Sequence, residues 1–354
     1  SVLDIYVAGY GAVGEALVRM IRDNSSNIAE KTGKEIRIAG IANSKGYVID
    51  REGIEPDEVE ARLRSGADEK NVGFTDAILE NASRGSIFVD CSNSETLQES
   101  YTAFFRNGIS VVSSNRRALA VPYAKYAALK SEALSNGASF RYDTTVGAAI
   151  PVLESFSSGT VNAESLQSIE AVISCTMNNI ITGYDGANTA SFATLLKKAQ
   201  DSGLTEKDPR MDLGGQDALR KILILAREAG IPLESSDVRI IPMLGKEFFD
   251  CTLDEFYSKL EKAEPEFIKR EAELDALDKR QRFVASLHRD SSAKNGYRAE
   301  IKMQFVGVES PFYWISGTEN VTIIKSDNSA PLVIRGAGEG ARQAASGVLN
   351  DILK

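Results

Sequence analysis

Short apolar runs alternate with amphipathic segments along the first 150 residues of the chain. The runs, which are rich in β-branched residues and typical of buried strands, cover residues 3–8, 36–42, 86–90, 108–112 and 139–142. Helical periodicity follows the first run from Glu15 to Ile21 and the third run from Leu97 to Tyr101. Strands that alternate with helices are typical of a parallel sheet. We therefore expect residues 1–150 to form an α/β domain with a doubly wound parallel sheet.

The pattern changes after residue 150. An apolar run over 167–174 predicts one more strand, and helical periodicity then appears over 190–201, 216–229 and 253–279. Three further runs, at 282–288, 298–305 and 320–325, are typical of antiparallel strands. Residues 151–330 are therefore expected to form a second, α+β domain. An apolar run at 332–335 and an alanine-rich helix follow, and we assign residues 331–354 to the first domain.

Composition narrows the chemistry that this fold can carry. Lys and Arg number 41 against 50 Asp and Glu, and the formal charge of −9 argues against a nucleic-acid or anionic-membrane partner. No apolar stretch is long enough to cross a membrane and no signal-peptide pattern is visible, so we expect a cytoplasmic protein. Three separated cysteines and a single histidine exclude a disulfide framework, a CxxC metal site and a histidine-based triad. The remaining chemistry uses Lys, Arg, Asp, Glu or a bound cofactor.

A glycine-rich turn joins the first predicted strand to the first helix. Gly9, Gly11 and Gly14 form a GxGxxG motif, with Ala12 and Val13 at the start of the helix. In this context the first glycine allows a tight turn, the second lets a pyrophosphate approach, and the third allows close packing of helix and strand. The helix N-terminus also offers N–H groups to the phosphates. These residues predict a Rossmann-type dinucleotide site; the alternative is a glycine-rich turn without a ligand.

Polar residues follow the ends of the other predicted strands. The second strand ends in Asn43, Ser44 and Lys45, where an NAD-binding protein commonly has a carboxylate for the ribose 2′-hydroxyl. Without a carboxylate, and with Lys45 to pair with a 2′-phosphate, the loop favours NADP over NAD. The alternative is that Lys45 is an ordinary loop residue in solvent. Ligands of such sheets bind beyond the carboxyl ends of the strands. The residues expected there after the third and fourth strands are Ser92, Asn93 and Asn115.

A charged segment precedes the helix predicted over 216–229. The loop before this helix carries Glu206, Asp208 and Asp212. The helix itself places Asp217 and Lys221 four residues apart on one face, and its other positions are mostly apolar. Grouped carboxylates suit a substrate that bears an ammonium group, and a partly desolvated lysine suits proton transfer. The alternative for Asp217 and Lys221 is a surface salt bridge.

Residues 205–221 closely resemble a motif of the homoserine dehydrogenase family, Thr-Glu-Pro-Asp-Pro-Arg-Asp-Asp-Leu-x-Gly-x-Asp-x-Ala-Arg-Lys, and the resemblance runs nearly end to end. Other matching stretches are 8–14, 42–45, 89–92, 142–151, 176–181 and 331–353. The residues at 42–45 and 221–230 are most similar to those of the bifunctional branch of the family, in which this module follows an aspartokinase. We therefore expect the chain to be a C-terminal fragment of such a protein. The resemblance implies reversible oxidation of L-homoserine to L-aspartate 4-semialdehyde with hydride transfer to NADP, a step of threonine and methionine biosynthesis.

The resemblance also implies roles for individual residues. Lys221 would be the general acid/base at the alcohol oxygen, and Glu206, Asp212 and Asp217 would hold the substrate amino group and orient this lysine. Thr176 would line the substrate pocket, and Gly340 would lie in a loop over the cofactor. A sodium-binding turn of main-chain carbonyls, or else a plain loop, is implied at Asp143, Val146, Ala148 and Ile150. The second domain would also form a homodimer through its sheet.

Some positions depart from the family pattern. Arg116 stands where relatives have a lysine after an asparagine; it keeps a positive charge for the reaction but cannot deprotonate usefully near neutral pH. Cys175 and Asn179 replace a glycine and a tyrosine, and Glu339 replaces a small residue. These changes favour one alternative, a catalytically weakened module that keeps NADP binding or dimer contacts. A further alternative, a semialdehyde dehydrogenase with a thiol nucleophile, would need Cys91 or Cys175 to be activated by a nearby base.

Overall fold

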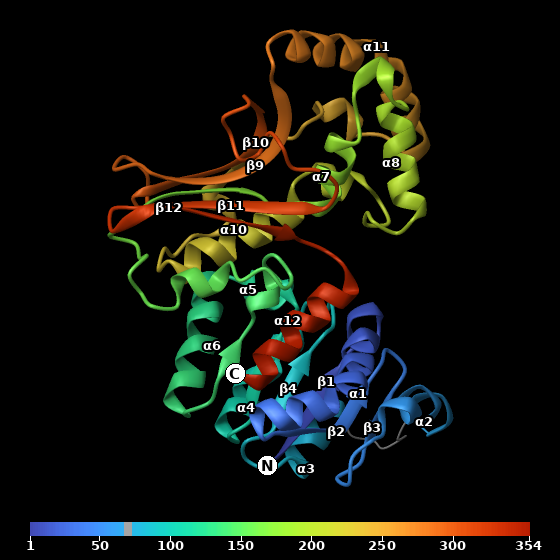
Figure 1. The fold of residues 1–354 in the computed structure, drawn as a ribbon, viewed down its shortest axis with the longest axis vertical. Helices are drawn as coiled ribbons and strands as arrows, with labels where there is room; N and C mark the ends of the chain where they lie inside the picture. Colours follow the sequence, from blue (N-terminus) through green and yellow to red (C-terminus); the bar gives the residue numbers. More distant parts are fainter. Residues whose placement is uncertain (67–72) are drawn as a thin grey trace. The chain divides into compact units, whose positions relative to one another are not determined.

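Two sheets of six strands each, in separate parts of the chain, organise the computed structural model, which describes residues 1–66 and 73–354 (Figure 1). The first unit consists of Ser1–Ala149 together with Gly340–Lys354. The second unit is the continuous segment Ile150–Glu339. The chain therefore leaves the first unit once and returns to it for its last helix.

The sheet of the first unit has the strand order β3-β2-β1-β4-β5-β6. Neighbouring strands are parallel, except that β3 runs antiparallel to β2 along one edge. The strands are β1 (Val2–Ala8), β2 (Glu35–Ala42), β3 (Tyr47–Ile49), β4 (Ile87–Asp90), β5 (Ser110–Ser113) and β6 (Phe140–Arg141). The expected α/β fold is confirmed. The edge strand β3 was not predicted. The strand order reverses between β1 and β4, which is where doubly wound sheets bind their ligands.

Helices complete the core of the first unit. They are α1 (Ala12–Thr32), α2 (Val59–Gly66), α3 (Phe74–Asn81), α4 (Tyr101–Arg106), α5 (Arg116–Leu119), α6 (Tyr123–Ser135) and α12 (Ala341–Leu353). α12 packs beside α1, although more than 300 residues separate them in sequence. Buried side chains of both helices, Leu17 and Val348 among them, share one apolar cluster with Ile5 and Val7 of β1. The C-terminal segment is thus an integral part of this core.

The sheet of the second unit has the order β12-β11-β7-β9-β10-β8. Its pairs are antiparallel apart from β8, which is parallel to β10. The strands are β7 (Leu166–Val172), β8 (Val238–Ile240), β9 (Arg280–Arg289), β10 (Tyr297–Val306), β11 (Glu319–Ser326) and β12 (Ser329–Ala337). Five of these correspond to the runs identified in the sequence, and the three-residue β8 does not. The expected α+β character of this unit is confirmed.

Five helices accompany this sheet in the described residues. They are α7 (Cys175–Thr182), α8 (Phe192–Asp201), α9 (Arg210–Leu213), α10 (Gln216–Glu228) and α11 (Leu253–Ala276). α10 is apolar and almost fully buried from Ile222 to Ala226, and it packs on β9. α11 continues through Pro265. None of the helices in residues 1–66 and 73–354 combines the length and the apolar character needed to cross a bilayer.

The return to the first unit occurs at Gly340 rather than at residue 331. The apolar run at 332–335 lies within β12, which pairs antiparallel with β11, for example through Ile334 opposite Thr322. These hydrogen bonds keep residues 331–339 in the second unit. The run itself carries no information about which strand it joins.

Candidate active site

The glycine-rich turn between β1 and α1 has a geometry that only glycine allows at two of its positions. Gly9 has a φ of +101°, and a Cβ there would lie 2.8 Å from the carbonyl oxygen of Cys91. A Cβ on Gly14 would lie 2.0 Å from the carbonyl oxygen of Gly9. A Cβ on Gly11, by contrast, would meet no heavy atom within 4 Å, so the backbone there faces open space. This is the space that a pyrophosphate needs for a close approach.

The start of α1 suits an anion as well. The N-cap residue is Gly11, and no side chain among the described residues caps the helix. Ala12 and Val13 follow at its first turn, where main-chain N–H groups have no partner within the helix. Such a helix end binds phosphate through these groups. The residues present therefore fit a dinucleotide.

Asn43 shapes the loop after β2. Its side-chain oxygen accepts hydrogen bonds from the main-chain N–H of Lys45 (2.9 Å) and of Gly46 (3.0 Å). Ser44 and Lys45 are exposed at the tip of this loop. Gly340, also expected at the cofactor, begins the returning segment and precedes α12 with a φ of +125°. Lys45 is thus exposed to solvent beyond the end of β2.

A buried carboxylate joins the loops that follow β4 and β5. Asp90 accepts hydrogen bonds from the Ser92 hydroxyl (2.6 Å), from the Asn115 amide (3.2 Å) and from the Tyr101 hydroxyl. Burial raises the pKa of Asp90, while these hydrogen bonds act against that shift. The Asn115 side-chain oxygen is buried without a hydrogen-bond partner. The network therefore fixes Ser92 and Asn115 at the expected ligand edge, and Asn93 stays exposed beside them.

Arg116 contacts the turn for which a sodium ion is implied. Its Nε donates a hydrogen bond to the carbonyl oxygen of Thr145, 3.0 Å away. Ala148, further along the turn, has a φ of +52°, an uncommon conformation for a residue with a side chain. The turn begins at Asp143 and includes the buried Val146. Arg116 therefore has a local structural partner in addition to its positive charge.

A cation in this turn would depend on main-chain oxygens. The described residues contain no cluster of three or more His, Cys, Asp or Glu side chains arranged to hold a metal ion. The carbonyl oxygen of Ile150, the first residue of the second unit, accepts a hydrogen bond from Val152 (2.8 Å). A carbonyl oxygen has a second lone pair, so this contact is compatible with a cation ligand.

Lys221, on α10 of the second unit, is a buried lysine. It is 2% exposed on α10, and its Nζ donates a hydrogen bond to the carbonyl oxygen of Ile173, 2.6 Å away. The same Nζ lies 3.2 Å from Oδ2 of Asp217, one helical turn earlier. An ammonium group has three N–H donors, so these contacts leave one for a substrate oxygen. The burial of Lys221 rules out a surface salt bridge for this pair.

Two carboxylates, Glu206 and Asp217, lie within electrostatic reach of Asp212, and Asp217 also contacts Lys221. Oδ2 of Asp212 accepts a hydrogen bond from the main-chain N–H of Glu206 (3.0 Å). Burial raises the pKa of Asp212 to about 6, and the charges of Glu206 and Asp217 push it in the same direction. Thr176 donates its hydroxyl to the carbonyl oxygen of Leu204 (2.9 Å) and so holds the same loop. An ammonium group of a substrate would relieve the repulsion among these carboxylates.

Asp208 has a different role from its neighbours. Its carboxylate oxygens accept hydrogen bonds from Arg210 Nε (2.9 Å) and Nη2 (2.7 Å), and these hydrogen bonds lower the pKa of Asp208. Arg210 also donates to the carbonyl oxygen of Cys251 (2.5 Å). The Asp208–Arg210 pair holds the loop against the segment before α11. The negative charge of Asp208 is therefore already balanced by Arg210.

Two family models match the chain. A family model described as "Homoserine dehydrogenase" matches residues 151–353. A second, "Homoserine dehydrogenase, NAD binding domain", matches residues 9–143. The chain belongs to the homoserine dehydrogenase family. The predicted membership is confirmed, and with it an NAD-binding domain.

Relatives of this homoserine dehydrogenase family member are both bifunctional and monofunctional. The bifunctional aspartokinase/homoserine dehydrogenase 1, chloroplastic, of Zea mays is 28% identical over 100% of this chain and 38% of its own length. The homoserine dehydrogenase of Schizosaccharomyces pombe is 25% identical over 99% of this chain and 95% of its own length. A hyperthermophilic archaeal homoserine dehydrogenase in complex with NADPH superposes with a TM-score of 0.73 at 23% identity, covering 100% of this chain and 97% of that one. The chain spans less than half of the maize protein.

Cys91 and Cys175 lack the features of a nucleophilic thiol in this homoserine dehydrogenase family member. Burial, followed by the charge of Asp90, raises the pKa of Cys91 to about 12, so the thiol stays protonated near neutral pH. Cys175 is buried, and its Sγ donates to the side-chain oxygen of Asn320 (3.3 Å). The geometry therefore disfavours a thiol-based semialdehyde dehydrogenase.

Sequence patterns missed three contributors to the site. Two are main-chain carbonyls, of Ile173 and Leu204, and a carbonyl carries no signal of its own in a sequence. The third is Asp90, whose signal was visible: a carboxylate that ends an apolar strand is buried by its position and needs hydrogen-bond donors. Its partner Tyr101 comes from the next helix, which only the fold brings near.

Proposed function

We propose that the chain interconverts L-homoserine and L-aspartate 4-semialdehyde by hydride transfer, with NADP as the preferred cofactor. The observation that carries this proposal is the buried ammonium group of Lys221, held between the Ile173 carbonyl and Asp217 beside an acidic loop. This arrangement matches a substrate that has an ammonium group and an alcohol on one short chain. The family assignment supports the same reaction.

Different side chains bind the substrate and transfer the proton. Glu206 and Asp212 bind the substrate ammonium group and so fix the position of the alcohol. During reduction the Lys221 ammonium group gives a proton to the aldehyde oxygen, and during oxidation Lys221 acts in its neutral amine form and takes the hydroxyl proton, as a general acid and base. When bound, the nicotinamide accepts or supplies the hydride at the same carbon. Asp217 balances the charge of Lys221 and orients it, and Thr176 keeps the acidic loop in place.

The first unit would hold the dinucleotide. The main chain at Gly11, Ala12 and Val13 receives the pyrophosphate, and the bare surface of Gly11 supports this assignment. Lys45 pairs with a 2′-phosphate in the loop shaped by Asn43, which supports NADP over NAD. Arg116 supplies a positive charge near the reacting oxygens but leaves proton transfer to Lys221.

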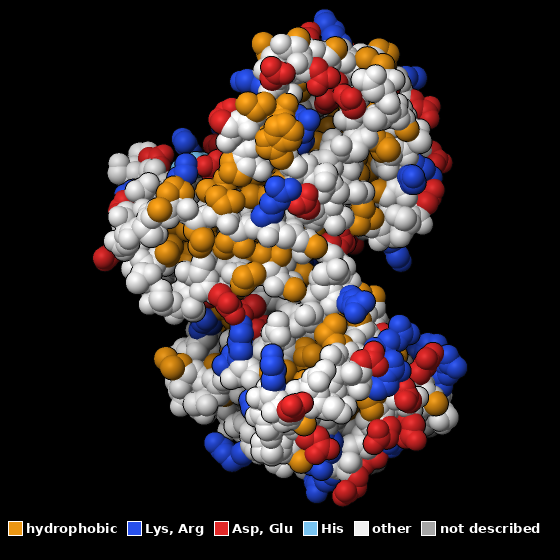
Figure 2. All heavy atoms as spheres, viewed as in Figure 1, with side chains coloured by type: hydrophobic (Ala, Val, Ile, Leu, Met, Phe, Trp, Pro, Cys, Tyr) orange, Lys and Arg blue, Asp and Glu red, His pale blue; other side chains and the backbone are white. Residues whose placement is uncertain are grey.

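We also propose that the chain forms a homodimer and that it is fused to an aspartokinase. Figure 2 shows apolar side chains gathered over the strands of the second sheet. Exposed apolar residues of the strands include Phe305 on β10 and Leu332 and Val333 on β12, each more than 40% exposed. Such a patch supports a homodimer formed through this sheet. The bifunctional relatives support fusion to an aspartokinase and a place in amino-acid biosynthesis, and the turn at Asp143–Thr145 and beyond supports a sodium ion.

The test is the nicotinamide absorbance change of the purified chain with L-homoserine, followed with NADP and with NAD. We expect turnover with both and a higher kcat/KM with NADP. Folded protein that binds NADPH without turning over homoserine would replace the proposal with the weakened binding module. Equal kcat/KM values for the two cofactors would refute the role of Lys45. Sedimentation of the same sample tests the dimer.

A further inference from the structure

Asn320 of β11 is a buried polar residue that no step of the proposed reaction uses. It is 2% exposed. Its side-chain oxygen accepts a hydrogen bond from Sγ of Cys175 (3.3 Å), whereas its Nδ2 finds no hydrogen-bond partner in residues 1–66 and 73–354. A buried donor that stays unpaired destabilises the folded chain. An apolar side chain would avoid this loss, so Asn320 calls for an explanation other than packing.

Cys175 begins α7 at the point where the chain supports Lys221. Two residues earlier, the Ile173 carbonyl oxygen accepts the hydrogen bond from the Lys221 ammonium group (2.6 Å). One residue later, the Thr176 hydroxyl holds the acidic loop. The hydrogen bond from Cys175 to Asn320 therefore joins β11 to the short stretch that carries both contacts.

The pairing of β11 with β7 brings Asn320 to the same stretch in a second way. The two strands are antiparallel, and Val321 lies opposite Val172. Asn320 precedes Val321 and Ile173 follows Val172, so these two residues lie next to each other just beyond the last pair of the ladder. Asn320 thus adjoins Ile173 through the sheet and Cys175 through its side chain.

The Asn320 amide also lies against Gly338, the residue that follows β12. A Cβ on Gly338 would lie 2.1 Å from Cγ of Asn320, 2.2 Å from its Nδ2 and 2.4 Å from its Oδ1. The φ of Gly338 is not positive, so glycine is needed here for space and not for backbone conformation. The amide therefore contacts Gly338 and Cys175 at once, and a side chain at 338 would displace it.

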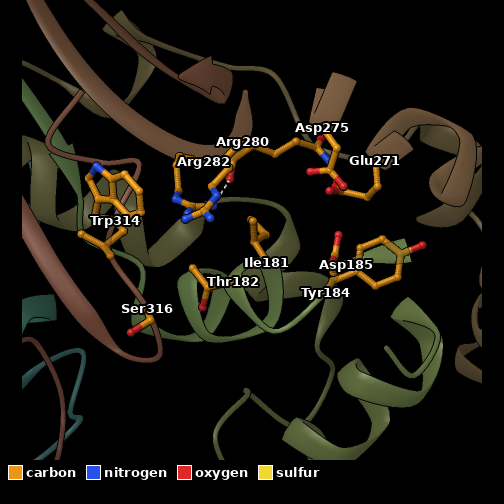
Figure 3. Close-up of a pocket in the computed structure, with 12 residues that line it drawn as sticks. Ile181, Thr182, Tyr184, Asp185, Glu271, Asp275, Arg280, Arg282, Trp314 and Ser316 are labelled. Carbon is orange, nitrogen blue, oxygen red and sulfur yellow. Dashed lines mark hydrogen bonds between the residues drawn. The ribbon is translucent and has the colours of Figure 1, made fainter. Parts of the chain in front are cut away.

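Other contacts fasten the rest of α7 to the segment around the start of β11. The Asn178 side-chain amide donates to the carbonyl oxygens of Gly317 (2.9 Å) and Glu319 (3.0 Å). Figure 3 shows Thr182 at the far end of α7, where its hydroxyl accepts a hydrogen bond from the main-chain N–H of Gly317 (3.1 Å). These contacts hold the middle and the end of the helix, and Asn320 holds its first turn.

We propose that Asn320 is a positioning residue for the reaction, an inference that rests on the proposed function of Lys221. Asn320 is held between Gly338 and Cys175 and fixes the first turn of α7. That turn sets where the Ile173 carbonyl holds the Lys221 ammonium group. A general acid or base must lie within hydrogen-bond reach of the proton it transfers, and a displacement of about 1 Å can lower the rate about 100-fold.

Removal of the amide tests this role. Asn320→Ala should lower kcat about 10- to 100-fold and leave NADPH affinity unchanged, because the glycine-rich turn belongs to the first unit. Cys175→Ala removes the other end of the same hydrogen bond and should lower kcat as well, also if Asn320→Ala does not fold. Thr322, two residues along the same face of β11, is 1% exposed and its hydroxyl has no hydrogen-bond partner in the described part of the chain. Thr322→Val is therefore the matched control and should leave kcat unchanged.

Gly338→Ala displaces the amide without removing it. This variant should lower kcat as Asn320→Ala does. In the double variant Gly338→Ala/Asn320→Ala the new Cβ no longer meets an amide, so kcat should equal that of Asn320→Ala alone. Losses that multiply in the double variant, a folded Asn320→Ala with kcat within a few-fold of the parent, or an equal loss in Thr322→Val would each overturn the proposal.

The position of Lys221 can also be followed without turnover. The rate at which N-hydroxysuccinimidyl acetate acetylates Lys221 is measured by mass spectrometry of the digested protein, with the exposed Lys197 as the internal reference. Acetylation of Lys221 should be several-fold faster in Asn320→Ala and Gly338→Ala than in the parent and in Thr322→Val. Equal rates in all four proteins would show that Asn320 does not position Lys221. A parent protein that fails to oxidise homoserine would refute the proposed function, and the acetylation rates would still decide whether Asn320 positions Lys221.

Discussion

Replacement of Lys221 by methionine tests the proposed proton transfer most directly. Methionine has nearly the length of lysine and no charge, so it fills the same space on α10. The variant loses the hydrogen bond to the Ile173 carbonyl (2.6 Å) and the contact with Asp217 (3.2 Å). General acid–base catalysis contributes about 10²–10⁴-fold to rate, which corresponds to roughly 3–5 kcal/mol of barrier. We therefore expect kcat to fall by that factor in both directions.

The stability of this variant should change much less than its activity. Loss of a charged hydrogen bond costs about 1.5–3 kcal/mol, but the variant no longer keeps an ammonium group away from water. The Asp217 side chain is 33% exposed and can be hydrated once its partner is gone. The two effects oppose each other, so we expect a net change within about 2 kcal/mol. Thermal unfolding and NADPH binding, both measured on the same sample, would verify this.

A second lysine offers a matched control. Lys197 and Asp201 of α8 have the same i,i+4 spacing and the same 3.2 Å separation, but the lysine side chain is 54% exposed. Lys197→Met should leave kcat unchanged and shift stability by about 0.5 kcal/mol or less. Retention by Lys221→Met of kcat within a few-fold of the parent, in protein that binds NADPH, would refute the role of Lys221. An equal loss of activity in both variants would refute the link between burial and catalysis.

Further results are expected for four residues. The pKa of Asp212, about 6, lies above its ordinary value of 3.8, so the carboxyl is ionised only as the pH rises through 6. kcat/KM for homoserine should fall below that pH, with the limb absent in Asp212→Asn; a persisting limb contradicts the assignment. The same raised pKa makes the chain less stable as the pH rises from 3.8 towards 6, and denaturant titrations of the parent and Asp212→Asn should differ accordingly. Gly14→Ala places a Cβ 2.0 Å from the Gly9 carbonyl oxygen, so NADPH affinity should fall at least tenfold in a calorimetric titration, and unchanged affinity would exclude the predicted turn. Lys45→Ala should raise the KM for NADP about tenfold and leave the KM for NAD unchanged. Arg116→Lys should keep or raise kcat. If Arg116→Lys is folded but inactive, the arginine has a role that lysine cannot fill.

The sequence predicted those parts of the site that depend on local geometry. The GxGxxG turn was recognisable because Gly9 and Gly14 answer steric demands within a few residues of each other. The pairing of Asp217 with Lys221 follows from helical spacing alone. The Ile173 carbonyl, which holds Lys221, belongs to the residue just after β7, 48 positions away in sequence, and could not be anticipated.

Long-range pairing explains the remaining differences. The short strand β8 pairs with β10 across a wide gap in sequence, so its three residues carry no clear pattern. The run at 332–335 was visible as a strand, but its assignment to a unit depended on the hydrogen bonds to β11. In both cases the pairing strand decides the outcome, and which strand pairs is known only once the fold is known.

The divided first unit has a consequence for the order in which the chain folds during synthesis. Its apolar cluster needs Ala345, Val348 and Ile352 of α12 to cover α1. A ribosome makes the intervening second unit, about 190 residues, in roughly 10–40 s. During that time Leu17 and its neighbours lack their final cover, while the second unit can already fold as a continuous segment. The first unit is thus completed only after the whole second unit has been made.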